Sequence, residues 1–256
     1  MADPSMLVCI DDRTESERAF HDARYRNDPR ADQEKFYSGL GESRRRFAEL
    51  LAAFATGNVV VEFGCGVDSL AFDLAERGVE VVGIDISPVA VEVAQAEAAA
   101  RGLKGATFRV MNAESLDFAD QSVDGVIGTA VLHHLDVASA FAEMSRVLKP
   151  DGRAVFLEPL GHNPLINWYR NRTPEARTPH EHPLRWQDFR LAHRWFQEVK
   201  VETFHLVSIL TSPISESRWG QPLHRIASAI DRRILAVNER LRWQAWIAVS
   251  EFRSPQ

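Results

Sequence analysis

The chain has 256 residues, enough for one large α/β domain or a domain with a modest appendage. Its 45% hydrophobic and 26% charged residues are ordinary for a globular protein, and its formal net charge of -6 excludes a global electrostatic attraction to nucleic acid. Two cysteines far apart in sequence exclude a disulfide framework. With an acidic N-terminus that lacks an apolar core, they favour a reduced, cytoplasmic protein without a signal peptide. No apolar run approaches the roughly 18 residues of a membrane span.

The first 40 residues are polar and charged, with scattered aromatic side chains. Pro29 divides them into two short helical pieces, which we expect to form a cap before the sheet. Tyr25 and Tyr37 are candidates to close over a bound ligand as a lid, and ordinary packing of a cap helix is the alternative. In residues 42–54 the apolar positions recur at i, i+3, i+4 and i+7, which predicts an amphipathic helix.

From residue 58 the chain alternates between short apolar runs and helical segments. Ser87 and Asp136 are predicted helix N-caps, and Lys149–Gly152 is a predicted turn. Such alternation favours right-handed crossovers and a doubly wound sheet. The predicted strands are 58–63, 79–84, 107–111, 124–128 and 153–158, and the predicted helices between them are 67–77, 88–101 and 136–148.

After Glu158 the pattern changes. Residues 160–185 are rich in proline, histidine and arginine, and we expect a long loop or short helices over a pocket. The remaining predicted elements are a helix at 186–196, a strand at 199–210, an amphipathic helix at 222–240 and a last strand at 243–252 that could enter the sheet antiparallel. We expect the 222–240 helix to pack against the sheet, and resting on a membrane is the alternative.

These elements predict a Rossmann-like α/β fold. Its sheet would have seven strands, mostly parallel with an antiparallel last strand, a helical N-terminal cap and an insertion after the fifth strand. The predicted single domain divides into a cap (1–40), a cofactor-binding core (41–159), a substrate-side insertion with helices (160–240) and a final strand (241–256).

A glycine turn follows the first predicted strand. Gly64 and Gly66 permit a tight turn and a close backbone approach to a ligand, and Asp85 ends the second strand, where a carboxylate can accept hydrogen bonds from ribose hydroxyls. The sixth position of a dinucleotide fingerprint is Ser69 rather than glycine. Glu62 and Asp68 beside the turn would repel phosphates and suit a ligand with a cationic amino-acid part. An adenosine-containing ligand of that kind is the natural inference.

Several segments together resemble the motifs of class I S-adenosylmethionine-dependent methyltransferases of the ubiquinone/menaquinone-type, or type 11, branch. The resemblance extends over about residues 58–160. Two departures are Asp68 at the family's third turn glycine and Asn112 at the usual acid of the third-strand motif. Asp68 could instead cap the following helix. The matching segments are 62–66, 82–87, 112–118, 122–126 with 131–135, and 143–152.

The resemblance implies S-adenosyl-L-methionine as cofactor and S-adenosyl-L-homocysteine as product. It implies that Asp85 holds the ribose, for which an N-cap beside Ser87 is the alternative role. The other implied cofactor-binding residues are Glu62, Gly64, Cys65 and Gly66 at the methionine end, Ile86, Asn112, Ala113 and Glu114 at the adenine, and Thr129 and His134 along the ligand.

Candidate catalytic bases come at the ends of the fourth and fifth strands: His133, His134 and Glu158. Substrate-side candidates in the insertion are His162, Trp168 and Arg172. The run 180–182, His-Glu-His, could suggest a metal, but no other ligands are suitably spaced, so we predict a turn there and no metal.

All six tryptophans follow the predicted nucleotide-binding half, which fits an aromatic or lipidic pocket. We therefore predict a small-molecule methyltransferase, with O-methylation of a hydrophobic or aromatic metabolite favoured. The alternatives are N- or C-methylation, or a non-catalytic regulatory protein that binds S-adenosylmethionine. Nucleic-acid methylation is disfavoured by the acidic balance. The oligomeric state is not indicated.

Overall fold

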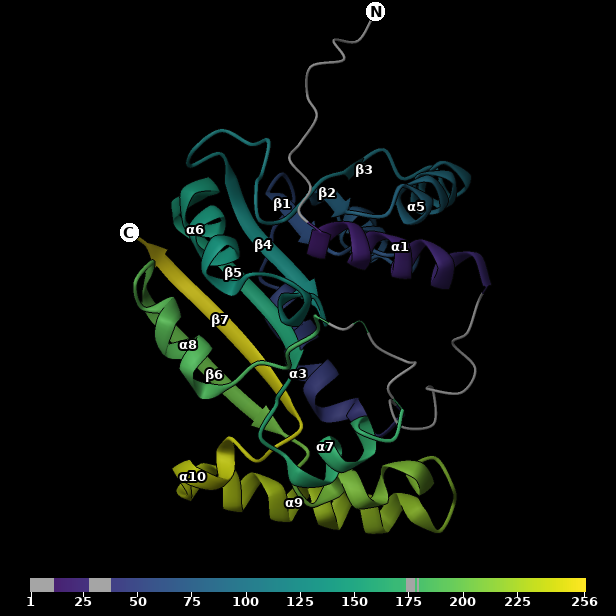
Figure 1. Cartoon of the computed structure of the whole chain (residues 1–256), viewed down its shortest axis with the longest axis vertical. Helices are drawn as coiled ribbons and strands as arrows, with labels where there is room; N and C mark the ends of the chain where they lie inside the picture. The colour runs from purple at the N-terminus through teal and green to yellow at the C-terminus, as the bar shows by residue number, and fades with distance from the viewer. Residues whose placement is uncertain (1–11, 28–37, 174–177, 179) are drawn as a thin grey trace, which may run out of the picture.

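Seven strands form one mixed sheet in the computed structural model, which describes residues 12–27, 38–173, 178 and 180–256 (Figure 1). The order is β3-β2-β1-β4-β5-β7-β6. Strands β1 to β5 pair in parallel, and β7 runs antiparallel to both of its neighbours, β5 and β6. The predicted Rossmann-like sheet with an antiparallel last strand is confirmed. The strands are β1 Val59–Phe63, β2 Glu80–Asp85, β3 Ala106–Val110, β4 Val123–Thr129, β5 Leu148–Pro159, β6 Phe196–Phe204 and β7 Ile247–Pro255.

Helices cover both faces of this sheet. One buried cluster includes Phe141 and Met144 of α6 with Phe189 of α8, and the other includes Phe47 of α3 and Leu74 of α4. The sheet is therefore the middle of three layers. The α-helices are α1 Asp12–Asn27, α3 Gly41–Leu51, α4 Ala71–Glu76, α5 Pro88–Arg101, α6 Val137–Val147, α7 Pro164–Arg170, α8 Trp186–Ala192, α9 Gly220–Val237 and α10 Glu239–Arg242, and the short 3-10 helices are η2 Ser38–Leu40, η3 Leu132–His134 and η5 Ser208–Ile214.

Local signals placed two helices correctly. The hydroxyl of Ser87 accepts a hydrogen bond from the amide of Ala90, and α5 ends at Gly102 in the left-handed conformation (φ 69°). The Asp136 carboxylate accepts from the amide of Ser139 at the start of α6. Both predicted N-caps are confirmed because each depends only on residues within one helical turn.

Helix α4 differs from the prediction at its start. It begins at Ala71, not at residue 67. The amides of Leu70 and Ala71 donate to the carboxylate of Glu62, which stands at the end of β1. A residue of the preceding strand thus holds the start of this helix.

The predicted turn at Lys149–Gly152 lies inside β5. The pairing of β4 with β5 shifts between Val123 and Gly125, whose partners are Leu148 and Arg153. The residues between these partners form a bulge, so β5 begins at Leu148.

The second half of the chain also departs from the predicted boundaries. Strand β6 ends at Phe204, short of the predicted residue 210, because the chain enters η5 at Ser208. The predicted 222–240 helix is divided into α9 and α10, where the Asn238 side chain caps the second piece.

Helices α1 and α9 lie in different parts of the molecule. Helix α1 contacts α5, whereas α9 contacts η5, β6 and α10 and runs along the far end of the molecule (Figure 1). Among the described residues, no helix is both long enough and apolar enough to cross a bilayer.

Candidate active site

A cavity of about 1660 Å³ lies at the carboxyl ends of the parallel strands. The glycine turn after β1 and the end of β2 line one part of it. Helix α1, helix α7 and η5 line the rest. This is where ligands bind in open α/β sheets, because the strand order reverses between β1 and β4.

The turn after β1 requires glycine at two positions. Gly64 and Gly66 have φ values of 59° and 55°. A Cβ on Gly64 would lie 2.7 Å from Cγ2 of Val131, and a Cβ on Gly66 would lie 3.0 Å from the hydroxyl of Tyr25. Tyr25 of α1 therefore covers the turn closely, and both glycines line the cavity with the intervening Cys65, as predicted. Burial raises the pKa of the Cys65 thiol, so this side chain is neutral.

Asp85 connects the end of β2 to the glycine turn. Its Oδ2 accepts from the amide of Gly66 at 3.0 Å, and its Oδ1 accepts from the amide of Ser87 at 2.8 Å. Burial raises the pKa of this carboxyl. Each oxygen keeps a second lone pair, so the carboxylate can still accept from ligand hydroxyls in the cavity, which it lines together with Ile86.

Glu62 lies under the same turn. Its Oε1 accepts from the amide of Leu70 at 2.9 Å, and its Oε2 accepts from the amide of Ala71 at 3.1 Å and from the hydroxyl of Ser69. Burial raises the pKa of Glu62 to about 7. Ser69, which replaces the last glycine of a dinucleotide fingerprint, thus helps to hold an acidic side chain beside the ligand-binding turn.

On the predicted adenine side, Asn112, Ala113 and Glu114 line the cavity. The Asn112 side chain accepts from the amide of Glu114 at 2.9 Å. The Glu114 carboxylate accepts from Nη2 of Arg13 at 2.7 and 2.5 Å and from the amide of Asp136 at 2.8 Å. The side chain of Glu114 therefore fastens α1 to the core, a partnership that the sequence did not predict.

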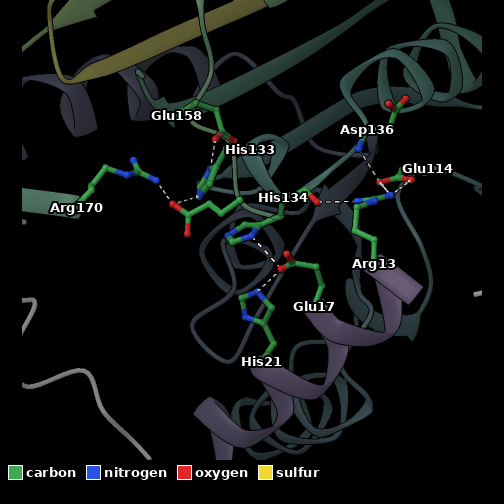
Figure 2. Close-up of polar contacts among 10 residues, drawn as sticks. Arg13, Glu17, His21, Glu114, His133, His134, Asp136, Glu158 and Arg170 are labelled. Carbon is green, nitrogen blue, oxygen red and sulfur yellow. Dashed lines mark hydrogen bonds and ion pairs between the residues drawn. The ribbon is translucent and has the colours of Figure 1, made fainter. Parts of the chain in front are cut away.

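His133 and Glu158 form a buried dyad (Figure 2). Oε1 of Glu158 accepts from the amides of Val131 and Leu132, both at 2.8 Å, and Oε2 lies 2.8 Å from Nδ1 of His133. With an ionised carboxylate as partner, Nδ1 carries the proton and Nε2 is the acceptor nitrogen. His133 lines the cavity, but Glu158 is 0% exposed and does not. Glu158 therefore meets the cavity only through His133, and its part in catalysis remains a prediction from the sequence.

Glu181 and His182 of the insertion lie close to His133 of this dyad. Glu181 forms an ion pair with Arg170 of α7, and its Oε1 lies 4.0 Å from Nε2 of His133 (Figure 2). The amide of His182 donates to the carbonyl of His133 at 2.9 Å. The run 180–182 thus packs on the dyad, and both Arg170 and Glu181 line the cavity.

His134 faces α1. Its Nδ1 lies 3.1 Å from Oε2 of Glu17, and that oxygen lies 3.7 Å from Nε2 of His21, both without hydrogen-bond geometry. Burial lowers the pKa of His134 to about 4. Burial raises the pKa of Glu17, but the imidazoles of His134 and His21 outweigh it and hold this pKa well below its usual range. His134 is therefore neutral and a weaker base at pH 7 than an ordinary histidine.

Two groups in the described part of the chain bring possible metal-ligand atoms within 4.8 Å of one another. The first is Glu17, His21 and His134, and the second is His133, His134 and Glu181. Glu181 is already paired with Arg170. The absence of a metal remains a prediction from the sequence.

The substrate-side predictions have mixed outcomes. Tyr25 and Trp168 line the cavity, as does Thr129 at the end of β4. His162 and Arg172 are not among the residues that line it: Nε2 of His162 accepts from the amide of Trp186 at 3.3 Å, and the Arg172 guanidinium lies 3.9 Å from the centre of the Trp168 ring. Tyr37 lies outside the described residues.

The sequence analysis missed the polar residues that α1 contributes. Arg13, Glu17 and His21 all line the cavity, and Nη1 of Arg13 also donates to the carbonyl of His134 at 2.9 Å. Their spacing of four residues is the only signal that could have placed them on one face of a helix.

Residues 61–156 match a family model described as a methyltransferase domain. The ubiquinone/menaquinone biosynthesis C-methyltransferase UbiE of Geotalea daltonii is 34% identical over 125 residues, covering 47% of this chain and 53% of the relative. Aklanonic acid methyltransferase DauC of Streptomyces sp. strain C5 is 35% identical over 130 residues, covering 49% and 57%. The chain thus spans about half the length of these curated relatives.

A solved structure resembles nearly the whole fold. Geranyl diphosphate C-methyltransferase from Streptomyces coelicolor has a TM-score of 0.63 at 16% identity, covering 94% of this chain and 98% of that one. At this identity the likeness concerns the fold alone. Together with the family match over residues 61–156, which include the glycine turn, it shows a Rossmann-like α/β fold that carries a segment similar to a methyltransferase domain.

Proposed function

We propose that the protein transfers a methyl group from S-adenosyl-L-methionine to a hydroxyl of a small hydrophobic or aromatic metabolite, with His133 as the general base. The match of residues 61–156 to a methyltransferase domain supports methyl transfer, and the curated relatives named above carry methyltransferase names. Because the chain covers only about half of those relatives, both the activity and the acceptor belong to this proposal.

The residues around the glycine turn fit the cofactor. Asp85 would accept hydrogen bonds from the ribose hydroxyls, and the backbone of Gly64–Gly66 would lie against the methionine part. The fit rests on the two left-handed glycines and on the buried acids Glu62 and Asp85, which suit a ligand with a cationic part and without phosphates. When bound, the cofactor supplies a methyl group on a positively charged sulfonium.

The observation that carries the proposal is the contact between His133 and Glu158. Two backbone amides hold the carboxylate in place, and the carboxylate holds the imidazole with Nε2 as its acceptor nitrogen. An acceptor hydroxyl in the cavity would give its proton to Nε2 while its oxygen attacks the methyl group. The buried Glu158 carboxylate would then stabilise the imidazolium that forms. An amine acceptor that is already neutral needs no such base, so the dyad favours oxygen.

The walls of the cavity support an apolar acceptor. Sulfonium charge is lost during methyl transfer, so a largely apolar enclosure favours the reaction. Aromatic and aliphatic walls also bind the body of a hydrophobic metabolite. The apolar side chains on the substrate side are Leu165, Ile166, Trp168, Ile209, Leu210 and Trp246.

A methyl-transfer screen with labelled cofactor tests the proposal. Phenols, carboxylic acids, amines and quinone precursors would serve as acceptors, with the wild type, His133→Gln and His162→Gln compared. We expect transfer to a phenol-type hydroxyl that His133→Gln abolishes and His162→Gln retains, since His162 does not line the cavity.

Other outcomes separate the alternatives. If the methyl group goes to an amine or a carbon, and His133→Gln does not slow that transfer, the protein is an N- or C-methyltransferase instead. Tight cofactor binding, measured by calorimetry, without transfer to any acceptor would favour a regulatory S-adenosylmethionine-binding protein.

A further inference from the structure

Helix α9 exposes a continuous apolar stripe. The members of the stripe are spaced by four, three, four and seven residues, which places them on one side of a helix. Trp219 and Val237 at its two ends are 83% and 86% exposed. Leu241 of the following helix α10 is also an exposed apolar residue. The stripe consists of Trp219, Leu223, Ile226, Ile230, Val237 and Leu241.

A different face of α9 packs against the protein. Ala227, Ser228 and Leu235 are buried there. Asp231 on this face accepts hydrogen bonds from the amides of residues 206, 207 and 208, at 3.1, 2.7 and 3.0 Å. These bonds fix the rotation of the helix and leave the stripe outside.

The helix packs against β6 of the sheet, as expected, but its isoleucines lie largely outside that contact. Ile226 and Ile230 are 59% and 43% exposed, and Leu241 of α10 is 37% exposed. Single exposed apolar residues are ordinary, but a row along a whole helix marks an interaction surface. Figure 1 shows α9 at the end of the molecule, and α9 contacts η5, β6 and α10.

Arginines flank the stripe. Arg218, Arg225, Arg233 and Arg240 are exposed, and Arg232 is exposed but pairs with Glu42 of α3. The exposed acids of residues 216–242 are Glu216 and Glu239. The whole chain carries a formal charge of -6, so the positive charge of this face runs against the balance of the protein. An apolar stripe bordered by arginines is the pattern of a helix that lies in a membrane interface.

The same charges argue against a second copy as the occupant. A two-fold contact through the stripe would bring the arginine rows of both copies together, and like charges repel. An anionic bilayer instead satisfies both parts of the surface, since its headgroups pair with arginine and its acyl boundary takes the apolar side chains.

The cavity opens beside this surface. Leu210 of η5 is 66% exposed and lines the cavity, and η5 packs on α9. Leu165 and Trp168 of α7 are also exposed cavity-lining residues. We propose that the α9 stripe, together with Leu210, seats the protein on an anionic lipid surface, with the apolar mouth of the cavity facing the lipid.

Vesicle co-sedimentation tests the proposal. The probes are vesicles of pure phosphatidylcholine and vesicles with phosphatidylglycerol added. We expect binding to the anionic vesicles that weakens with added salt. Ile226→Glu with Ile230→Glu should weaken it at least tenfold, and Arg225→Gln or Arg233→Gln by about fivefold each. Val93→Glu is the matched control, because Val93 is an exposed apolar residue of a helix outside this surface.

Two results would overturn the proposal. One is equal binding of the wild type and the Ile226/Ile230 variant, or none by either, when circular dichroism shows both folded. The other is a dimer in analytical ultracentrifugation that the same variant dissociates, which would assign the stripe to a second copy. Neither readout involves methyl transfer, so failure here leaves the proposed function standing.

Discussion

Nδ1 of His133 lies 2.8 Å from Oε2 of Glu158, although the two residues are 25 positions apart and stand at the ends of neighbouring strands. The contact fixes both the orientation and the tautomer of an imidazole that faces a large cavity. Its counterpart His134, the next residue, turns the other way toward Glu17. Adjacent histidines therefore have separate partners and, in our proposal, separate tasks.

Glu158→Gln should reduce turnover without preventing cofactor binding. Glutamine keeps an acceptor for the two backbone amides but removes the charge that stabilises an imidazolium. We expect kcat to fall about 10- to 100-fold and the double variant with His133→Gln to be no slower than His133→Gln alone. Steady-state rates and the pH profile of kcat measure this. Additive losses in the double variant would contradict a dyad.

The pH dependence of stability should carry a contribution from Glu62. Its folded pKa of about 7 lies above the usual 4.5, so the stabilising contribution is full below about pH 4.5 and is lost as pH rises through 7. Relative to Glu62→Gln, the wild type should lose about 3 kcal/mol of unfolding free energy between pH 4.5 and 8. Urea unfolding across that range measures the difference, and a constant difference would refute the raised pKa.

His205 should affect the pH dependence of stability in the direction opposite to Glu62. It is buried between the hydroxyls of Ser43 and Ser208, at 3.0 and 3.2 Å, and burial lowers its pKa to about 4. Its contribution is present above pH 6.5 and is lost as pH falls through 4. His205→Asn tolerates the left-handed backbone there (φ 66°) and should make acid unfolding less steep. If the unfolding free energies of the wild type and His205→Asn, measured by urea titration, fall equally between pH 7 and 4, the lowered pKa of His205 is contradicted.

The ion pair between Arg13 and Glu114 should hold α1 in place. Arg13→Gln removes three hydrogen bonds to the core, so we expect faster proteolysis within α1 and about tenfold weaker cofactor binding. Arg18→Gln is the control, because Arg18 pairs with Glu15 of the same helix and is partly exposed. Limited proteolysis and calorimetry report the two effects. If both variants behave alike, the ion pair between Arg13 and Glu114 does not hold α1 in place.

A chelator should leave methyl transfer intact. Glu181 is paired with Arg170, so the carboxylate of one candidate cation group already has a cationic partner. We expect unchanged rates after dialysis against EDTA. A loss that Zn²⁺ or Mg²⁺ restores would establish a metal at one of the two groups.

Features encoded within a few residues were predictable from sequence. The Ser87 and Asp136 caps, the end of α5 at Gly102 and the turn at Gly64–Gly66 all follow from local backbone chemistry. The alternation of strands and helices then fixed the topology, because right-handed crossovers leave few arrangements.

Features that depend on distant partners were not predictable. The start of α4 moved because Glu62 captures two amides eight and nine positions away. The exposed face of α9 could not be predicted because the rotation of the helix is set by the amides of residues 206–208, which donate to Asp231. Periodicity identifies an amphipathic helix but not which of two apolar faces is buried.

The position of α1 has a kinetic consequence. Tyr25 approaches the glycine turn, Asp22 bonds to Ser87, and Arg13 pairs with Glu114, so α1 is fastened along the cofactor side of the cavity. A cofactor lying on that turn would be trapped until the helix undocks. Release of the spent cofactor would then be slower than methyl transfer, and the rate at which the helix opens would limit turnover.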